Sequence, residues 1–223
     1  MKAAYARRIG LSMVALAGCF GLCPAAPAVA RPITFAFTGE AKDIVDLAYQ
    51  IYPEYVREGS EFSGWLTFET TTPNATPDSA TEATYVGAIL DCHVQLGALS
   101  LDFITDTTNN DIATGNDMPI SPPWDYRDFY GFHLPIAILD TPVTGGIGLI
   151  DDTATALDSL AIQEMPPSLE DFDRKWFVFN VIGQGIRIEG QLHSLTLVPE
   201  PGAMSILGLG AVFFSTRRAR RNR

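Results

Sequence analysis

Hydrophobic side chains recur at every second position through much of residues 31–198. Ile33, Phe35 and Phe37, for example, alternate with small or polar residues. This spacing gives one apolar face only to an extended strand, because successive side chains of a strand point to opposite sides. The same alternation or a run that is apolar on both faces occurs in residues 62–70, 129–139, 175–182 and 185–192. The folded part is therefore predicted to be all-β.

Turn-forming residues separate these runs. Gly, Pro, Asn, Asp, Ser and Thr are frequent in residues 70–81, 107–123, 140–146 and 164–171. Such stretches predict loops. Short strands divided in this way favour a single antiparallel β-sandwich over residues 31–198, and they leave a jelly-roll or an immunoglobulin-like topology open.

Two details depart from the simple pattern. Pro135 lies inside one of the alternating runs, and because proline has no N–H it predicts an edge strand or a bulge there. Residues 44–51 carry apolar residues with i, i+3, i+4, i+7 spacing, which predicts a short helix that Pro53 would end.

The first 30 residues are predicted to be a cleaved secretory signal peptide. A basic start precedes an apolar run from Ile9 to Leu22, and small residues at positions 28 and 30 form an A-x-A-like cleavage site. The mature protein would begin at Arg31. A competing site is present in the sequence LAGC, which ends at Cys19 and matches a lipobox, so that Cys19 is an alternative site of lipidation.

Removal of the signal peptide leaves a strongly acidic protein. Residues 31–198 contain seven Lys or Arg and twenty-five Asp or Glu, a difference of −18. Such a charge repels nucleic acid, so no nucleic-acid partner is expected. Cys92 is the one cysteine in this part of the chain, and it is expected to be a buried side chain rather than a reactive thiol.

The C-terminus predicts a membrane anchor. Residues 203–216 contain no charged residue and are dominated by apolar ones, which favours a short hydrophobic transmembrane helix. Arg217, Arg218, Arg220 and Arg221 follow, and the positive-inside rule would keep them in the cytoplasm.

Residues 199–223 resemble the PEP-CTERM sorting signal. The motif Pro199-Glu200-Pro201, the hydrophobic segment and the arginine cluster occur in the order that this signal requires. The resemblance implies an exported protein of a Gram-negative bacterium whose partner is an exosortase, a membrane transpeptidase that cuts near the motif. It also implies a periplasm-facing membrane anchor, then a place at the cell surface or outside the cell, in association with exopolysaccharide.

Sequence motifs for catalysis are absent from residues 31–198, where there is no G-x-S-x-G, P-loop, H-E-x-x-H or C-x-x-C sequence. The protein is therefore expected not to be an enzyme, and no cofactor is expected. An aromatic and charged cluster suggests carbohydrate binding instead, because it combines flat apolar faces with hydrogen-bonding groups. Its residues are Trp124, Tyr126, Arg127 and Tyr130, and Trp65 and Trp176 are further candidates for stacking on sugars.

A weaker hypothesis concerns calcium. Asp106, Asp111 and Asp117 lie in a polar segment that offers the oxygen ligands that Ca²⁺ prefers.

The sequence as a whole predicts that the chain has three parts: a signal peptide (residues 1–30), a β-sandwich (31–198) and a sorting segment (199–223). The middle domain would be a non-catalytic surface protein. The alternatives are a secreted glycan-active hydrolase and a purely structural envelope or matrix protein.

Overall fold

The computed structural model describes residues 31–47, 51, 54–105, 109–119, 126–138, 140–181 and 185–199. Within these ranges the chain forms ten strands and one 3-10 helix, η1 (Leu169–Asp171). The strands are β1 (Pro32–Asp46), β2 (Glu61–Glu69), β3 (Glu82–Val86), β4 (Ile89–Leu96), β5 (Leu99–Phe103), β6 (Asp111–Pro119), β7 (Tyr126–Ile138), β8 (Thr141–Asp151), β9 (Arg174–Val181) and β10 (Ile186–Leu197). The prediction of an all-β protein is confirmed.

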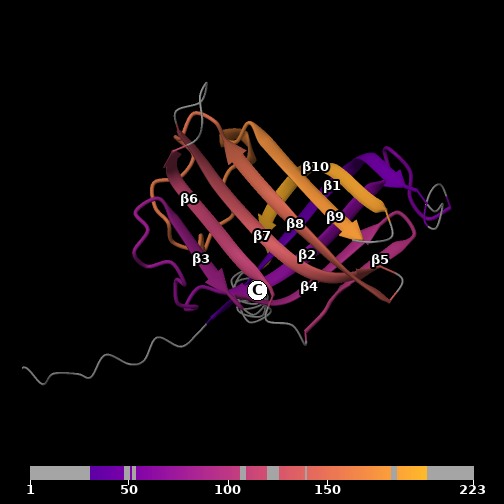
Figure 1. The fold of residues 1–223 in the computed structure, drawn as a ribbon, viewed down its shortest axis with the longest axis horizontal. Coiled ribbons are helices and arrows are strands. Elements are labelled where there is room, and N and C mark those ends of the chain that lie inside the picture. The colour runs from indigo at the N-terminus through magenta and orange to yellow at the C-terminus, as the bar shows by residue number, and fades with distance from the viewer. Residues whose placement is uncertain are drawn as a thin grey trace, which may run out of the picture.

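Eight of these strands form a closed barrel (Figure 1). Their order is β7-β5-β4-β2-β1-β10-β9-β8, and β8 pairs again with β7, so that the sheet returns to its starting strand. All the pairings are antiparallel. The predicted β-sandwich is therefore wrong, because a sandwich has two separate sheets, whereas here the β7–β8 ladder joins the two ends of one sheet.

Strand β7 changes partner along its length. Its first part pairs with β6, its last residues pair with β5, and on its other side β8 pairs with it from Asp128 to Ile138. Pro135 lies at the change, after the last residue bound to β6 and before the first bound to β5. The missing proline N–H thus falls between the β6 and β5 ladders, while β8 continues to pair with β7 on the other side. The predicted edge strand or bulge at Pro135 is wrong, because β7 has partner strands on both sides and no register shift occurs at this residue.

The seam between the first and last strands is long. β1 and β10 pair over eleven residue positions, with register shifts after Thr38 and after Ala41. Register shifts of this kind are β-bulges, which bend a strand and increase its twist. The bends allow one 15-residue strand to curve around the barrel and to contact both β2 and β10.

Aromatic side chains fill the interior. The rings of Phe35 and Phe68 meet edge to face with their centroids 4.9 Å apart, and the rings of Phe62 and Phe177 meet at 3.9 Å. Tyr130 and Phe132 from β7 lie in the same core. An eight-stranded barrel is just wide enough for side chains to fill it. The described interior is therefore a packed core, and a ligand site has to be sought on the outside.

A long connection between β8 and β9, residues 152–173, packs against the barrel. Leu157, Ile162 and Phe172 from this connection are buried in the core. The carbonyl oxygen of Leu160 accepts hydrogen bonds from the hydroxyls of Tyr85 (2.9 Å) and Thr114 (2.6 Å). The connection therefore covers the two-stranded extension, β3 and β6, as well as the barrel.

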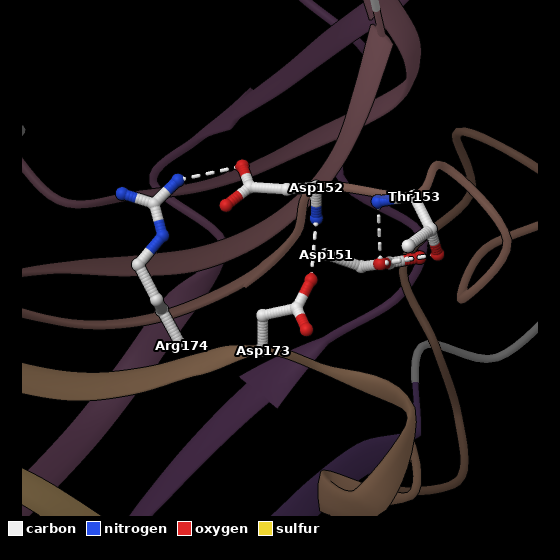
Figure 2. A network of polar contacts seen from close by, with 5 residues as sticks. All are labelled: Asp151, Asp152, Thr153, Asp173 and Arg174. Atoms are coloured by element: carbon white, nitrogen blue, oxygen red, sulfur yellow. Dashed lines mark hydrogen bonds and ion pairs between the residues drawn. The ribbon is translucent and has the colours of Figure 1, made fainter. Parts of the chain in front are cut away.

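Acidic residues hold both ends of this connection, as Figure 2 shows. The Asp151 carboxylate accepts hydrogen bonds from the backbone N–H and the hydroxyl of Thr153, at 2.8 and 2.6 Å. The backbone N–H of Asp152 donates to Asp173 (2.9 Å), and Arg174 donates to the Asp152 carboxylate (2.7 Å). The first and last residues of the connection are thereby joined to each other.

Three further predictions for the folded part are wrong. Residues 44–46 continue β1 instead of starting a helix, because Ile44, Val45 and Asp46 pair with β10. The predicted loops 107–123 and 140–146 contain all of β6 and the first half of β8. Their glycines and polar residues occupy outward positions or close contacts in strands, where they weaken the hydrophobic pattern without breaking the ladder.

The terminal predictions fall outside the described residues. These are the signal peptide (1–30) with Cys19, and the hydrophobic segment 203–216 with the arginine cluster. The structure gives no support to the predicted C-terminal helix. Within the residues that it describes, no helical segment has the length and hydrophobicity of a membrane span.

Candidate functional site

The outer face of β6, β7, β8 and β9 carries a groove with a floor of small residues. Strand register places the residues of these four strands in rows across the face. One row contains Ala113, Gly131, Gly148 and Trp176, and the next contains Asp111, His133, Gly146 and Val178. Ala113, Gly131 and Gly146 line a hollow of about 250 Å³ between larger side chains. We call this hollow and its surroundings the β6–β9 groove.

Two aromatic rings lie in this groove directly on glycines. The indole of Trp176 occupies the space in which a Cβ atom of Gly148 would stand, and the ring of Phe129 covers Gly131 in the same way. Glycine in a strand marks such a close approach of another group. Both rings line the groove and are partly exposed. The site therefore presents flat apolar surfaces in fixed positions.

Polar side chains line the rest of the groove. Asp111, His133, Thr144 and Asn180 border the hollow over the glycines and also an adjoining hollow of about 570 Å³. The second hollow continues past Pro135, where β7 changes partner. Its volume lies within the range of roughly 300–1,000 Å³ that is common for small-molecule sites. Aromatic stacking surfaces and hydrogen-bonding groups are thus arranged along one continuous depression.

His133 and Asp111 form a pair in the middle of the groove. His133 Nδ1 lies 3.3 Å from Asp111 Oδ2, and the histidine side chain is half exposed. The hydrogen bond that the Asp111 carboxylate accepts from His133 raises the pKa of His133, partial burial opposes this effect, and the negative charge of Asp111 adds to the rise. Because the pKa is raised, the pair contributes stability below the ordinary histidine value and loses it as pH rises through the folded-state pKa.

The predicted carbohydrate residues do not form one surface. Tyr130 is fully buried, and its side chain points into the barrel, as that of Phe132 does. Tyr126 is 54% exposed at the start of β7, and Arg127 is partly buried with its Nε lacking a hydrogen-bond partner. Trp124 lies outside the described residues. Tyr126 and Arg127 are therefore the members of the predicted set that the structure places toward the outside.

The predicted calcium ligands are not brought together either. Asp111 and Asp117 belong to the same strand, six residues apart, and at roughly 3.3 Å per residue they are about 20 Å from each other. The Asp117 N–H donates to Asp128 (3.0 Å). Asp106 lies outside the residues that the structure describes. Among the described residues, no group of three or more His, Cys, Asp or Glu side chains is placed to hold a metal ion.

Two buried carboxylates, Asp128 and Asp151, face each other across the β7–β8 ladder, 0% and 2% exposed respectively. Their carboxylate oxygens accept hydrogen bonds from backbone N–H groups of the chain. Asp128 accepts from the N–H groups of Asp117 and Leu157, and Asp151 accepts from those of Thr153, Thr155 and Ala156. Both residues therefore hold loops in place, and they do not contribute to the groove.

Comparison with known proteins identifies the C-terminal segment. Residues 197–221 match the family model described as the PEP-CTERM protein-sorting motif. The chain carries a PEP-CTERM sorting motif. No curated protein and no solved structure matches the chain. The motif marks an exported protein that an exosortase processes and sorts to the cell envelope or surface, as the resemblance of the sequence had implied.

The PEP-CTERM match begins inside the folded domain. It starts at Leu197, the last residue of β10, and the N–H of the next residue, Val198, donates to the carbonyl oxygen of Thr34 (2.8 Å). Pro199 is exposed at the end of the described residues, and Glu200 and Pro201 lie outside them. The sorting motif thus follows the barrel without an intervening linker.

The β6–β9 groove was not predicted as a site. The sequence predicts that Trp176 can stack on sugars, but its partners in the groove come from segments for which the sequence predicts loops or an ordinary strand. A signal was present in residues 144–148, TGGIG, where Gly146 and Gly148 share one strand face. Two glycines on the same face of a strand indicate a surface that another group approaches closely.

Proposed function

We propose that the barrel is a non-catalytic polysaccharide-binding domain that the PEP-CTERM motif delivers to the cell envelope. The observation that carries this proposal is the placement of Trp176 on Gly148, beside an open groove with polar edges. An indole offers a broad apolar face together with a polar N–H group. The C–H face of a sugar ring fits such a surface, and its hydroxyls fit the polar groups beside it.

The polar residues around Trp176 suit hydrogen bonds with hydroxyl groups. Asn180 and Thr144 are neighbours across the β8–β9 ladder, and each offers both a donor and an acceptor. Asp111 supplies an acceptor on the other side of the groove. The groove extends across four strands spaced about 4.8 Å apart, so that it accommodates an extended ligand better than a single ion. These features support a chain of sugars as ligand.

Binding to polysaccharide should depend on Trp176. We expect Trp176→Ala to weaken retention of the protein in native gels that contain the bacterium's own exopolysaccharide by about tenfold or more, because an aromatic contact at the centre of a site is often dominant. Asn180→Ala should have a smaller effect. Met165→Ala removes an exposed apolar side chain outside the groove and serves as the control. Equal retention of folded Trp176→Ala and wild type would contradict the proposal.

A glycan-active hydrolase remains the second candidate, and one observation gives it a location. Glu40 and Glu61 are direct neighbours on β1 and β2 and line a separate hollow of about 700 Å³ together with His193. Glycosidases use two carboxylates that flank the sugar bond. Glu40 also forms an ion pair with Lys42. New reducing ends released from the same polysaccharide by the wild type, and lost in Glu61→Gln, would favour this candidate over binding alone.

We also propose that the chain is first anchored in the membrane by residues 203–216, with the barrel in the periplasm and Arg217 to Arg221 in the cytoplasm. The absence of charge in this segment and the arginines after it support this orientation. Protease added to spheroplasts should digest the barrel, while a tag placed after the last arginine should stay protected in an exosortase-deficient strain. Protection of the barrel would contradict the orientation.

A further inference from the structure

Trp65 on β2 occupies a second exposed aromatic position. Its side chain is 37% exposed, and strand register places it in a row with Ala36 on one side and with His93 and Asp102 on the other. The rings of Trp65 and His93 lie side by side with their centroids 6.4 Å apart and an interplanar angle of 32°. His93 Nδ1 is 2.9 Å from Asp102 Oδ1. Trp65, His93 and Asp102 thus repeat the residue types of the β6–β9 groove.

Hydroxyl groups flank Trp65 on both sides along the strands. Thr34 and Thr67 share a hydrogen bond of 2.9 Å in one neighbouring row, and Thr38 and Ser194 share one of 2.7 Å in the other. A hydroxyl has one donor and two acceptor positions, so that each of these groups keeps capacity for a further partner. Ala36, the neighbour of Trp65 on β1, carries only a methyl group, and Trp65 is 37% exposed. We call Trp65 and these flanking residues the β2 platform.

The platform and the groove face opposite directions. The barrel contains eight strands in the order β7-β5-β4-β2-β1-β10-β9-β8, so that β2 and β8 are four strands apart in either direction around the ring. β8 carries Gly146 in the floor of the groove and Gly148 under Trp176. In a closed ring of eight, strands four places apart lie across the barrel axis from each other. A short stretch of one polymer chain therefore cannot occupy both sites.

We propose that the β2 platform is a second polysaccharide-binding site, which makes the barrel a cross-linker of polysaccharide chains. The inference rests on the proposed function of the groove. The ligand class is a neutral polysaccharide, because a domain with seven basic and twenty-five acidic residues repels polyanions. Each site alone is an open surface with few contacts, and a polymer with many repeats engages many protein copies at once. Cross-linking then follows from the opposite positions of the two sites.

The experiment compares binding with cross-linking. The purified protein is mixed with the bacterium's own exopolysaccharide, a soluble neutral β-glucan or alginate. Binding is measured by affinity electrophoresis and cross-linking by light scattering and viscosity. The wild type should bind a neutral polymer and increase its particle size several-fold. Trp65→Ala and Trp176→Ala should each keep part of the binding and lose the increase in size, and the double variant should lose both. Met165→Ala should behave as the wild type.

Four results would overturn the inference. If Trp65→Ala cross-links as well as the wild type, or if Trp176→Ala alone abolishes binding, the platform is not a site, although the groove proposal stands. If the wild type binds alginate alone, the ligand class is wrong. If the wild type binds none of the polymers, the proposed function itself fails. Ala36→Glu places a charged chain beside the intact Trp65 and should also abolish cross-linking, so that the test does not depend on the folding of Trp65→Ala.

Discussion

Replacing Asp151 with alanine should lower the free energy of unfolding by about 3–5 kcal/mol, one of the largest effects that a single polar substitution can have in this barrel. The Asp151 carboxylate is 2% exposed and accepts backbone hydrogen bonds from Thr153, Thr155 and Ala156 at 2.7–3.0 Å. Removing it leaves these N–H groups without their partner at the start of the connection that covers the barrel. Chemical denaturation of the two proteins measures the difference.

The neighbouring residue provides a matched control. Asp152 also bears a carboxylate, but its ion pair with Arg174 is at the surface, where such a pair contributes between about 0 and 1 kcal/mol. Asp152→Ala should therefore change the free energy of unfolding far less than Asp151→Ala. Similar losses in the two variants would show that Asp151 has no special role in holding the connection.

The same residue should make the barrel acid-sensitive. Burial raises the pKa of Asp151, but the hydrogen bonds from Thr153, Thr155 and Ala156 outweigh this effect and lower the pKa from 3.8 to about 2. A lowered folded-state pKa gives stability that is present above pH 3.8 and lost as pH falls towards 2. Between these two pH values the wild type should lose more stability than Asp151→Ala.

Replacing Gly190 with alanine should cost about 3 kcal/mol of stability, because the added methyl group has no room. Gly190 lies on β10 and points inward, and a Cβ atom there would overlap the ring of Phe177 and the backbone carbonyl oxygen of Glu40. A side chain can move away, but the carbonyl belongs to the β1–β10 seam. Thermal and chemical denaturation should both detect the loss.

Two further variants test whether the loss in Gly190→Ala comes from the overlap of its methyl group or from any substitution in β10. Ser194→Ala removes an exposed hydroxyl from the outer face of the same strand and should change stability by less than about 0.5 kcal/mol. Phe177→Leu should be less costly in the Gly190→Ala background than in the wild type, because it makes part of the missing space. Additive costs of the two substitutions would contradict the overlap.

The inward side chains of the strands were predictable from the sequence, but the way in which the strands close was not. The alternating positions of β7, from Tyr130 to Ile138, are all buried as the pattern predicted. Alternation defines which face of a strand is buried, and it contains no information on the neighbouring strand. The β1–β10 seam joins residues about 150 positions apart, and the β7–β8 ladder turns an open sheet into a barrel. Both depend on the whole chain.

The groove was harder to predict than the core for a related reason. Its residues come from four strands, and two of these strands contain glycine and polar residues that favour loops when the local sequence is considered alone. Gly131, Gly146 and Gly148 have a role only when Phe129 and Trp176 on neighbouring positions cover or border them. Phe129 and Gly131 lie on the same strand, but strand register brings Trp176 to Gly148 from another strand, and a local pattern cannot supply that neighbour.

The junction of the barrel with the sorting motif also determines how the domain bears mechanical load. A force applied to the sorting motif would reach the barrel through Pro199, directly after β10. This strand is hydrogen-bonded on both sides, to β1 over eleven positions and to β9 over six. A force along the axis of β10 shears these two ladders and loads many hydrogen bonds together instead of peeling them apart one by one. The tethered end of the domain is thus a strand that two ladders hold, one on each side.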